Sequence, residues 1–156
     1  MVDIDGVISL FASGLDASAA GSFHSIEGIP HFLSVTAAAH LLALRDQFEL
    51  VWASGWEERA NEHLPHLLEL PRDMPFLRFE RDVGRGNAHW KLDAIELFAG
   101  GRPLAWIDDA LDDACERWAA AREAPTLLVR TEPNVGLTER EATLLSQWAQ
   151  SLAAKE

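Results

Sequence analysis

Six polar residues that stand beside or between short apolar runs could together carry out phosphoryl chemistry. A carboxylate can act as a nucleophile toward phosphorus, and a second carboxylate can protonate the leaving oxygen and then activate water. A hydroxyl and an ammonium group can stabilise the phosphoryl oxygens. Close carboxylates also suit Mg²⁺, which prefers oxygen ligands and offsets their mutual repulsion. The residues are Asp3, Asp5, Ser54, Lys91, Asp108 and Asp109.

Five short apolar runs are predicted to be the strands that position these side chains. Nearly unbroken apolar stretches between polar residues are typical of strands that are covered on both faces. Helical patterns fill the intervals, and this alternation indicates β-α-β units with a parallel sheet. Ligands of such sheets bind beyond the carboxyl ends of the strands, where most of the six residues fall. The strands are predicted at Val2–Ile4, Leu50–Ala53, Phe76–Phe79, Leu104–Ile107 and Leu127–Val129.

Five helical segments are predicted between and after these strands. Ser34 is placed to cap the first helix. Pro65 is expected to split or kink the second helix. Thr138 and Glu141 have the spacing of a capping box at the start of the last helix. The helices are predicted at Val35–Phe48, Glu57–Leu70, Trp90–Ala99, Ala110–Glu123 and Thr138–Ala154.

The segment Ser9–Leu33 does not fit this alternation, because it is rich in glycine, serine and alanine. We interpret it as a flap that contains a hairpin turning near Glu27–Gly28. It is too short to be a second domain. The 156 residues are therefore expected to form one domain over residues 1–156, with the flap inserted at 9–33.

The charge of the chain is strongly negative, with 13 basic and 25 acidic residues and a formal net charge of −12. This balance argues against tight, non-specific nucleic-acid binding, so nucleic acid is not expected as a partner. The single cysteine, Cys115, excludes an intramolecular disulfide and fits a reducing compartment. No signal peptide is visible, and no apolar run approaches the ~20 residues that span a bilayer. We therefore expect no membrane association and a cytoplasmic location.

The order of the motifs resembles that of the haloacid dehalogenase-like (HAD) superfamily. The resemblance is carried by DIDGV at the first strand, a serine after the second, a lysine before the fourth and DD after the fourth. It covers about residues 1–130. It implies a three-layer α/β/α Rossmann-like sandwich with a five-stranded, mainly parallel sheet. The short flap would stand in place of a cap domain.

The resemblance also implies a role for each site residue. Asp3 would be the nucleophile and Asp5 the general acid and base. Ser54 and the backbone of Gly55 would bind the phosphoryl group, and Lys91 would offset the charge on Asp3 and the phosphate. The Mg²⁺ ligands would be Asp3, the carbonyl of Asp5, and Asp108 with Asp109 beside it.

These residues predict a Mg²⁺-dependent phosphohydrolase that acts through an aspartyl-phosphate. The expected substrate is a phosphorylated small molecule or an exposed phosphate on a larger substrate. A second subunit could close a nearly capless site, which makes a homo-oligomer a possible state. The alternative is a non-catalytic HAD-like module that binds metal or a partner, and the short first strand, which starts almost at Met1, favours it. A metal-dependent nuclease is a third alternative, disfavoured by the net charge and by the Ser54–Lys91 pair.

Overall fold

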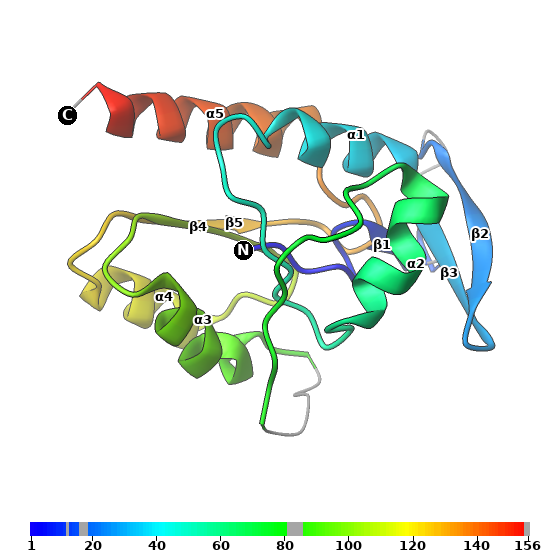
Figure 1. The fold of residues 1–156 in the computed structure, drawn as a ribbon, viewed down its shortest axis with the longest axis horizontal. Coiled ribbons are helices and arrows are strands. Elements are labelled where there is room, and N and C mark those ends of the chain that lie inside the picture. The colour runs from blue at the N-terminus through cyan, green and yellow to red at the C-terminus, as the bar shows by residue number, and fades with distance from the viewer. Residues whose placement is uncertain (12, 16–18, 81–85, 155–156) are drawn as a thin grey trace.

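The structure is a computed structural model that describes residues 1–11, 13–15, 19–80 and 86–154. Helices α1 and α5 lie on one side of strands β4 and β5, and helices α3 and α4 lie on the other side (Figure 1). The chain is thus an α/β protein. In the part that the structure describes, no helix is both long and apolar enough to cross a membrane. The elements are, in order, β1 (Ser9–Leu10), β2 (Gly21–Ile26), β3 (Ile29–Ser34), α1 (Val35–Ala43), α2 (Arg59–Leu68), the 3₁₀ turn η1 (His89–Lys91), α3 (Leu92–Ala99), β4 (Leu104–Asp108), α4 (Asp113–Ala121), β5 (Thr126–Arg130) and α5 (Glu139–Ala153).

The parallel pairing that lies between these helices is regular only at β4 and β5, which pair along their whole lengths. Isolated parallel bridges join Val2 to Ile107 on β4 and to Trp52, and join Trp52 to Phe76. The predicted five-stranded, mainly parallel sheet is therefore wrong. The strands of the described residues form a two-stranded sheet, β4–β5, and a three-stranded antiparallel sheet in the order β1–β3–β2.

Local features explain why the other predicted strands shrink to single bridges. After Ile4 the chain coils back, because the Ile4 carbonyl accepts hydrogen bonds from the amides of residues 7–9. The Pro75 carbonyl accepts a hydrogen bond from the Trp52 amide, but Pro75 has no amide proton with which to extend the pairing. Each segment therefore leaves the sheet after one bridged residue.

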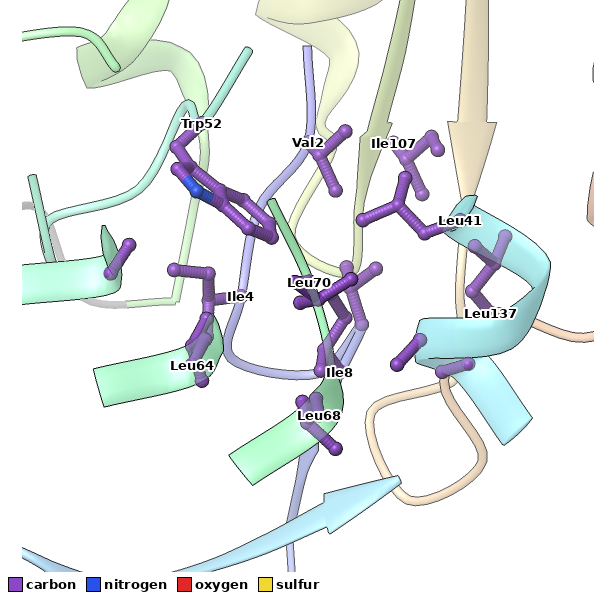
Figure 2. Close-up of a cluster of buried hydrophobic side chains, with 14 of the residues drawn as sticks. Val2, Ile4, Ile8, Leu41, Trp52, Leu64, Leu68, Leu70, Ile107 and Leu137 are labelled. Atoms are coloured by element: carbon purple, nitrogen blue, oxygen red, sulfur yellow. The ribbon is translucent and has the colours of Figure 1, made fainter. Parts of the chain in front are cut away.

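Two apolar clusters cover the two faces of these paired segments. Alternate residues of an extended segment point to opposite faces, so Trp52 lies in one cluster while Val51 and Ala53 lie in the other. Figure 2 shows the first cluster, into which α2 sends Leu64 and the first chain segment sends Ile4. Burial of one such leucine stabilises the fold by roughly 2 kcal/mol. Val2, Ile4 and Val7 pack in this cluster, so the chain is held in place on either side of Asp3 and Asp5.

The hairpin predicted at Glu27–Gly28 is confirmed. Strands β2 and β3 pair antiparallel up to Ile26 and Ile29, so Glu27 and Gly28 form a two-residue turn. Both turn residues have positive φ angles, 52° and 81°, as a type I′ turn requires. The flap also includes β1, which pairs with β3. Residues 12 and 16–18 of the predicted flap lie outside the described residues.

The helix ends agree with the predictions in part. The capping box of Thr138 and Glu141 is confirmed at the start of α5. Helix α2 continues through Pro65 instead of splitting there. Helix α4 begins after Asp112 and not at Ala110, because the Asp112 side chain accepts hydrogen bonds from two amides of the first turn.

The chain segment after β5 closes over the loop that carries Asp5. The Thr131 hydroxyl donates a hydrogen bond to the Gly6 carbonyl at 2.8 Å. The Leu137 amide donates another to the Val7 carbonyl at 2.9 Å. Thr131 and Leu137 are both buried. The loop after the first chain segment is therefore held in place by residues from the other end of the described chain.

Candidate functional site

A buried group of charged side chains lies where β4 and the first chain segment end. Asp3 follows Val2, Asp108 is the last residue of β4, and Lys91 is the last residue of η1. The Lys91 ammonium nitrogen lies 3.0 Å from one carboxylate oxygen of Asp3 and 2.6 Å from one of Asp108. All three residues are buried. One lysine therefore faces two carboxylates in a region with little solvent.

Asp109 joins this group and makes it a candidate metal site. One carboxylate oxygen from each of Asp3, Asp108 and Asp109 can be chosen so that all lie within 4.8 Å of one another. Asp109 approaches closely because Gly6 has no side chain. A Cβ atom on Gly6 would lie 2.7 Å from Asp109 Cβ and closer still to the carboxyl group. A set of carboxylate oxygens fits a hard divalent cation such as Mg²⁺.

The pKa values of this group reflect burial and an excess of negative charge. Burial raises the pKa of Asp3 to about 7, with Asp108 adding to the shift and Lys91 opposing it. Burial and Asp108 raise the pKa of Asp109 to about 6. Burial alone would lower the pKa of Lys91, but the Asp3 and Asp108 carboxylates outweigh it and the pKa is raised. A divalent cation would supply the positive charge that these carboxylates lack.

Asp5 lies at the edge of the same region, outside the cluster of three carboxylates. Its side chain is 44% exposed, and its carboxylate accepts a hydrogen bond from the indole nitrogen of Trp56 at 3.0 Å. His31 from the flap lies 3.9 Å from the other carboxylate oxygen of Asp5. Asp5 was predicted to bind the metal through its backbone carbonyl, and this stays a prediction.

Ser54 and Gly55 lie in the turn that leads into α2. Ser54 is buried, and its hydroxyl oxygen accepts a hydrogen bond from the Trp56 amide at 3.4 Å. The Gly55 carbonyl accepts one from the Arg59 guanidinium at 3.2 Å. This turn begins directly after Trp52 and Ala53, which the two apolar clusters hold.

A cavity of about 560 Å³ brings all of the predicted site residues to one place. The flap contributes Ile29 and His31 to its wall, and Trp56 and Trp90 contribute aromatic surface. Such a cavity is within the usual range for small-ligand sites. Its lining includes Asp3, Asp5, Ser54, Gly55, Lys91, Asp108 and Asp109.

Three residues at the cavity were not predicted from the sequence to act in the site. Trp56 stands two residues after Ser54, and this position was the only signal that pointed to it. His31 and Arg59 carried no signal, because the contacts of His31 with Ser9 and of Arg59 with Glu27 join chain positions that are far apart. His31 accepts from or donates to the Ser9 hydroxyl at 2.9 Å and lies against the Trp56 ring.

Comparison with known proteins adds one finding. A family model described as "HAD domain in Swiss Army Knife RNA repair proteins" matches residues 1–142. No curated protein and no solved structure matches the chain.

Proposed function

We propose, since the chain belongs to the family of HAD domains in Swiss Army Knife RNA repair proteins, that it is a Mg²⁺-dependent phosphohydrolase acting on a phosphate at the end of an RNA strand. One observation carries this proposal: Lys91 lies between the carboxylates of Asp3 and Asp108 beside the cavity. The nearby oxygens of Asp109 support a role for a divalent cation.

The expectation that nucleic acid is not a partner is wrong, because the family is described by its place in RNA repair proteins. The net charge of −12 is a property of the whole chain. A strongly negative net charge disfavours proteins that bind along many phosphates of a nucleic-acid backbone, because such binding needs many lysine and arginine side chains together. Binding the end of one strand needs only a few positive groups at one cavity, and a bound Mg²⁺ would add two charges there.

Asp3 is the proposed nucleophile. Lys91 binds one oxygen of its carboxylate at 3.0 Å, which leaves the other oxygen to attack phosphorus. The bond from Asp3 to phosphorus forms as the bond from phosphorus to the RNA oxygen breaks. Bound at Asp3, Asp108 and Asp109, Mg²⁺ would offset the negative charge on the phosphoryl oxygens. The Ser54 hydroxyl and the Gly55 amide are proposed to bind these oxygens as well.

Asp5 is the proposed general acid and base. Its carboxyl group gives a proton to the departing RNA oxygen and then takes one from the water that attacks the aspartyl-phosphate. This second attack releases inorganic phosphate and restores the Asp3 carboxylate. The hydrogen bond from the Trp56 indole at 3.0 Å supports this role, because it orients the Asp5 carboxylate at the cavity.

The test is release of inorganic phosphate from short RNA strands that carry a 5′ or a 3′ phosphate. We expect release by the wild-type chain with Mg²⁺ and none by Asp3→Asn. Asp46→Asn is the matched control, because exposed Asp46 does not line the cavity. Activity in Asp3→Asn would remove the nucleophile assignment. A wild-type chain that binds Mg²⁺ in calorimetry but releases no phosphate would support the non-catalytic alternative.

A further inference from the structure

The cavity contains a permanently charged cation that the reaction proposed above does not use. The positive charge of Lys91 is committed to Asp3 and Asp108. Arg59, the first residue of α2, lines the same cavity and is 46% exposed at its side chain. Among the described residues that line the cavity, Arg59 is the only arginine and Lys91 the only lysine. An anionic ligand that extends past the buried carboxylates would therefore meet Arg59.

The Arg59 guanidinium is held against the turn that contains Ser54. Its Nε donates a hydrogen bond to the Trp56 carbonyl at 3.4 Å, and one Nη donates to the Gly55 carbonyl at 3.2 Å. The other Nη donates to Glu27 at 2.7 Å. Two contacts thus orient the group from within its own segment, and the third comes from the tip of the flap.

Glu27 is an unusual residue for the place it occupies. It is the first residue of the two-residue turn and has a φ of 52°, where asparagine, aspartate or glycine is favoured. The Glu27 side chain is 48% exposed, and the Arg59 side chain is exposed to a similar extent. Ion pairs with this exposure contribute little to stability. A ligand anion could therefore replace Glu27 on Arg59 without disturbing the fold.

We propose that Arg59 binds the phosphodiester next to the terminal phosphate of the RNA strand, in place of Glu27. Arg59 thereby favours a strand end over a free mononucleotide, which has no phosphodiester. The planar guanidinium can donate two parallel hydrogen bonds to phosphate oxygens. The cavity volume of about 560 Å³ also exceeds what a single phosphate needs. That the ligand is an RNA strand rests on the proposed function.

Binding to the Asp3→Asn protein tests this inference, because the strand is not consumed there. Fluorescence anisotropy measures binding of a short, labelled oligouridylate with a terminal 5′ or 3′ phosphate in the presence of Mg²⁺. Competition with uridine monophosphate measures binding of a ligand without the phosphodiester. Arg59→Gln is the test variant, and circular dichroism checks that each protein is folded.

Arg102→Gln is a closely matched control. Arg102 also donates hydrogen bonds to two backbone carbonyls of its own segment and to a glutamate, Glu49, at 2.9 Å. It lines a separate groove that does not include the acidic residues of the site. The two variants therefore remove the same charge from similar local settings. Glu27→Gln and Glu49→Gln form the corresponding pair for the acidic partners.

We expect Arg59→Gln to weaken strand binding about ten-fold or more and uridine monophosphate binding much less. The slope of log affinity against log salt should become shallower by about 0.7, the value for one phosphate contact on a single strand. Glu27→Gln should tighten strand binding, and neither variant at 102 or 49 should change it. Equal effects of Arg59→Gln and Arg102→Gln, equal losses for both ligands, or no strand binding at all would overturn the inference.

The two proposals can fail separately. If Arg59→Gln selectively weakens strand binding but the wild-type chain releases no phosphate, the proposed function fails and the inference stands. If phosphate is released but the loss of Arg59 is not selective, the inference fails and the proposed function stands.

Discussion

Replacing Gly6 with alanine would test whether the close approach of Asp109 to the first loop builds the metal site. Gly6 has a φ of +75°, a conformation that costs an L-residue roughly 1–2 kcal/mol. Alanine also restricts the unfolded chain, which returns about 0.4–1 kcal/mol. The backbone effect alone therefore destabilises the fold by about 1 kcal/mol.

Gly28→Ala measures this backbone effect without a clash. Gly28 has a φ of +81°, and a Cβ there would meet no atom within 4 Å. At Gly6, the added Cβ would overlap the carboxyl group of Asp109. Because unstrained carbon atoms lie about 3.5–4.0 Å apart, Asp109 would have to move by roughly 1 Å. Overpacking of this kind adds about 1–3 kcal/mol to the destabilisation.

Urea unfolding without metal and calorimetric titration with Mg²⁺ measure the two consequences. We expect Gly28→Ala to lose about 1 kcal/mol and Gly6→Ala about 2–4 kcal/mol of unfolding free energy. Only Gly6→Ala should lose Mg²⁺ affinity, by about ten-fold or more, because a displaced ligand weakens the site. Equal Mg²⁺ affinity in the two variants, or equal destabilisation, would refute the role assigned to the Gly6–Asp109 contact.

Two further substitutions probe the charges around the site. Lys91→Met leaves Asp3 and Asp108 without their buried counter-charge, so the metal-free protein should lose about 3–5 kcal/mol of unfolding free energy. Mg²⁺ should then raise the Tm more in Lys91→Met than in the wild type; an equal rise would contradict the metal assignment. Asp112→Ala removes the cap of α4 and should cost about 1 kcal/mol in urea unfolding. Burial works against ionisation of Asp112, but hydrogen bonds from His89 and the first-turn amides lower its pKa from 3.8 to about 2. The stabilisation by ionised Asp112 is therefore present above pH 3.8 and is lost as the pH falls through 2. The unfolding free energies of the wild type and Asp112→Ala should converge in that window. A difference between them that does not change with pH would contradict this reasoning.

The parts of the fold that depend on neighbouring residues could be predicted from the sequence. Gly28 favours a turn at the tip of the hairpin, and Thr138 with Glu141 specifies a helix start. The strand pairing could not be predicted correctly, and a five-stranded sheet was expected in its place, because apolar runs do not reveal where pairing stops. The coil after Ile4 ends the first segment after a single bridge. The prediction of one domain over residues 1–156 stays a prediction.

The candidate site shows the same division. The motif order indicated that Asp3, Lys91 and Asp108 belong together. In the structure, the Lys91 ammonium nitrogen lies 3.0 Å from a carboxylate oxygen of Asp3 and 2.6 Å from one of Asp108. Their catalytic roles stay predictions. The contact of Trp56 with Asp5 and that of Arg59 with Glu27 join residues 51 and 32 positions apart. The first pair joins the turn before α2 to the loop that carries Asp5, and the second joins α2 to the tip of the flap. The spacing of residues along the chain does not reveal which of these segments lie close together.

The hydrogen bonds from Thr131 and Leu137 to the first loop also impose an order in time. Asp3 and Asp5 lie on either side of Ile4 and are made before Thr131, which follows its partner Gly6 by 125 residues. A nascent chain that has reached β5 therefore has both acids but lacks the donors that fix their loop. Domains fold as units once their distant contacts can form. The loop is thus fixed only after residue 137 has been made, so the candidate site is assembled at a late stage of synthesis and not when its first acidic residues appear.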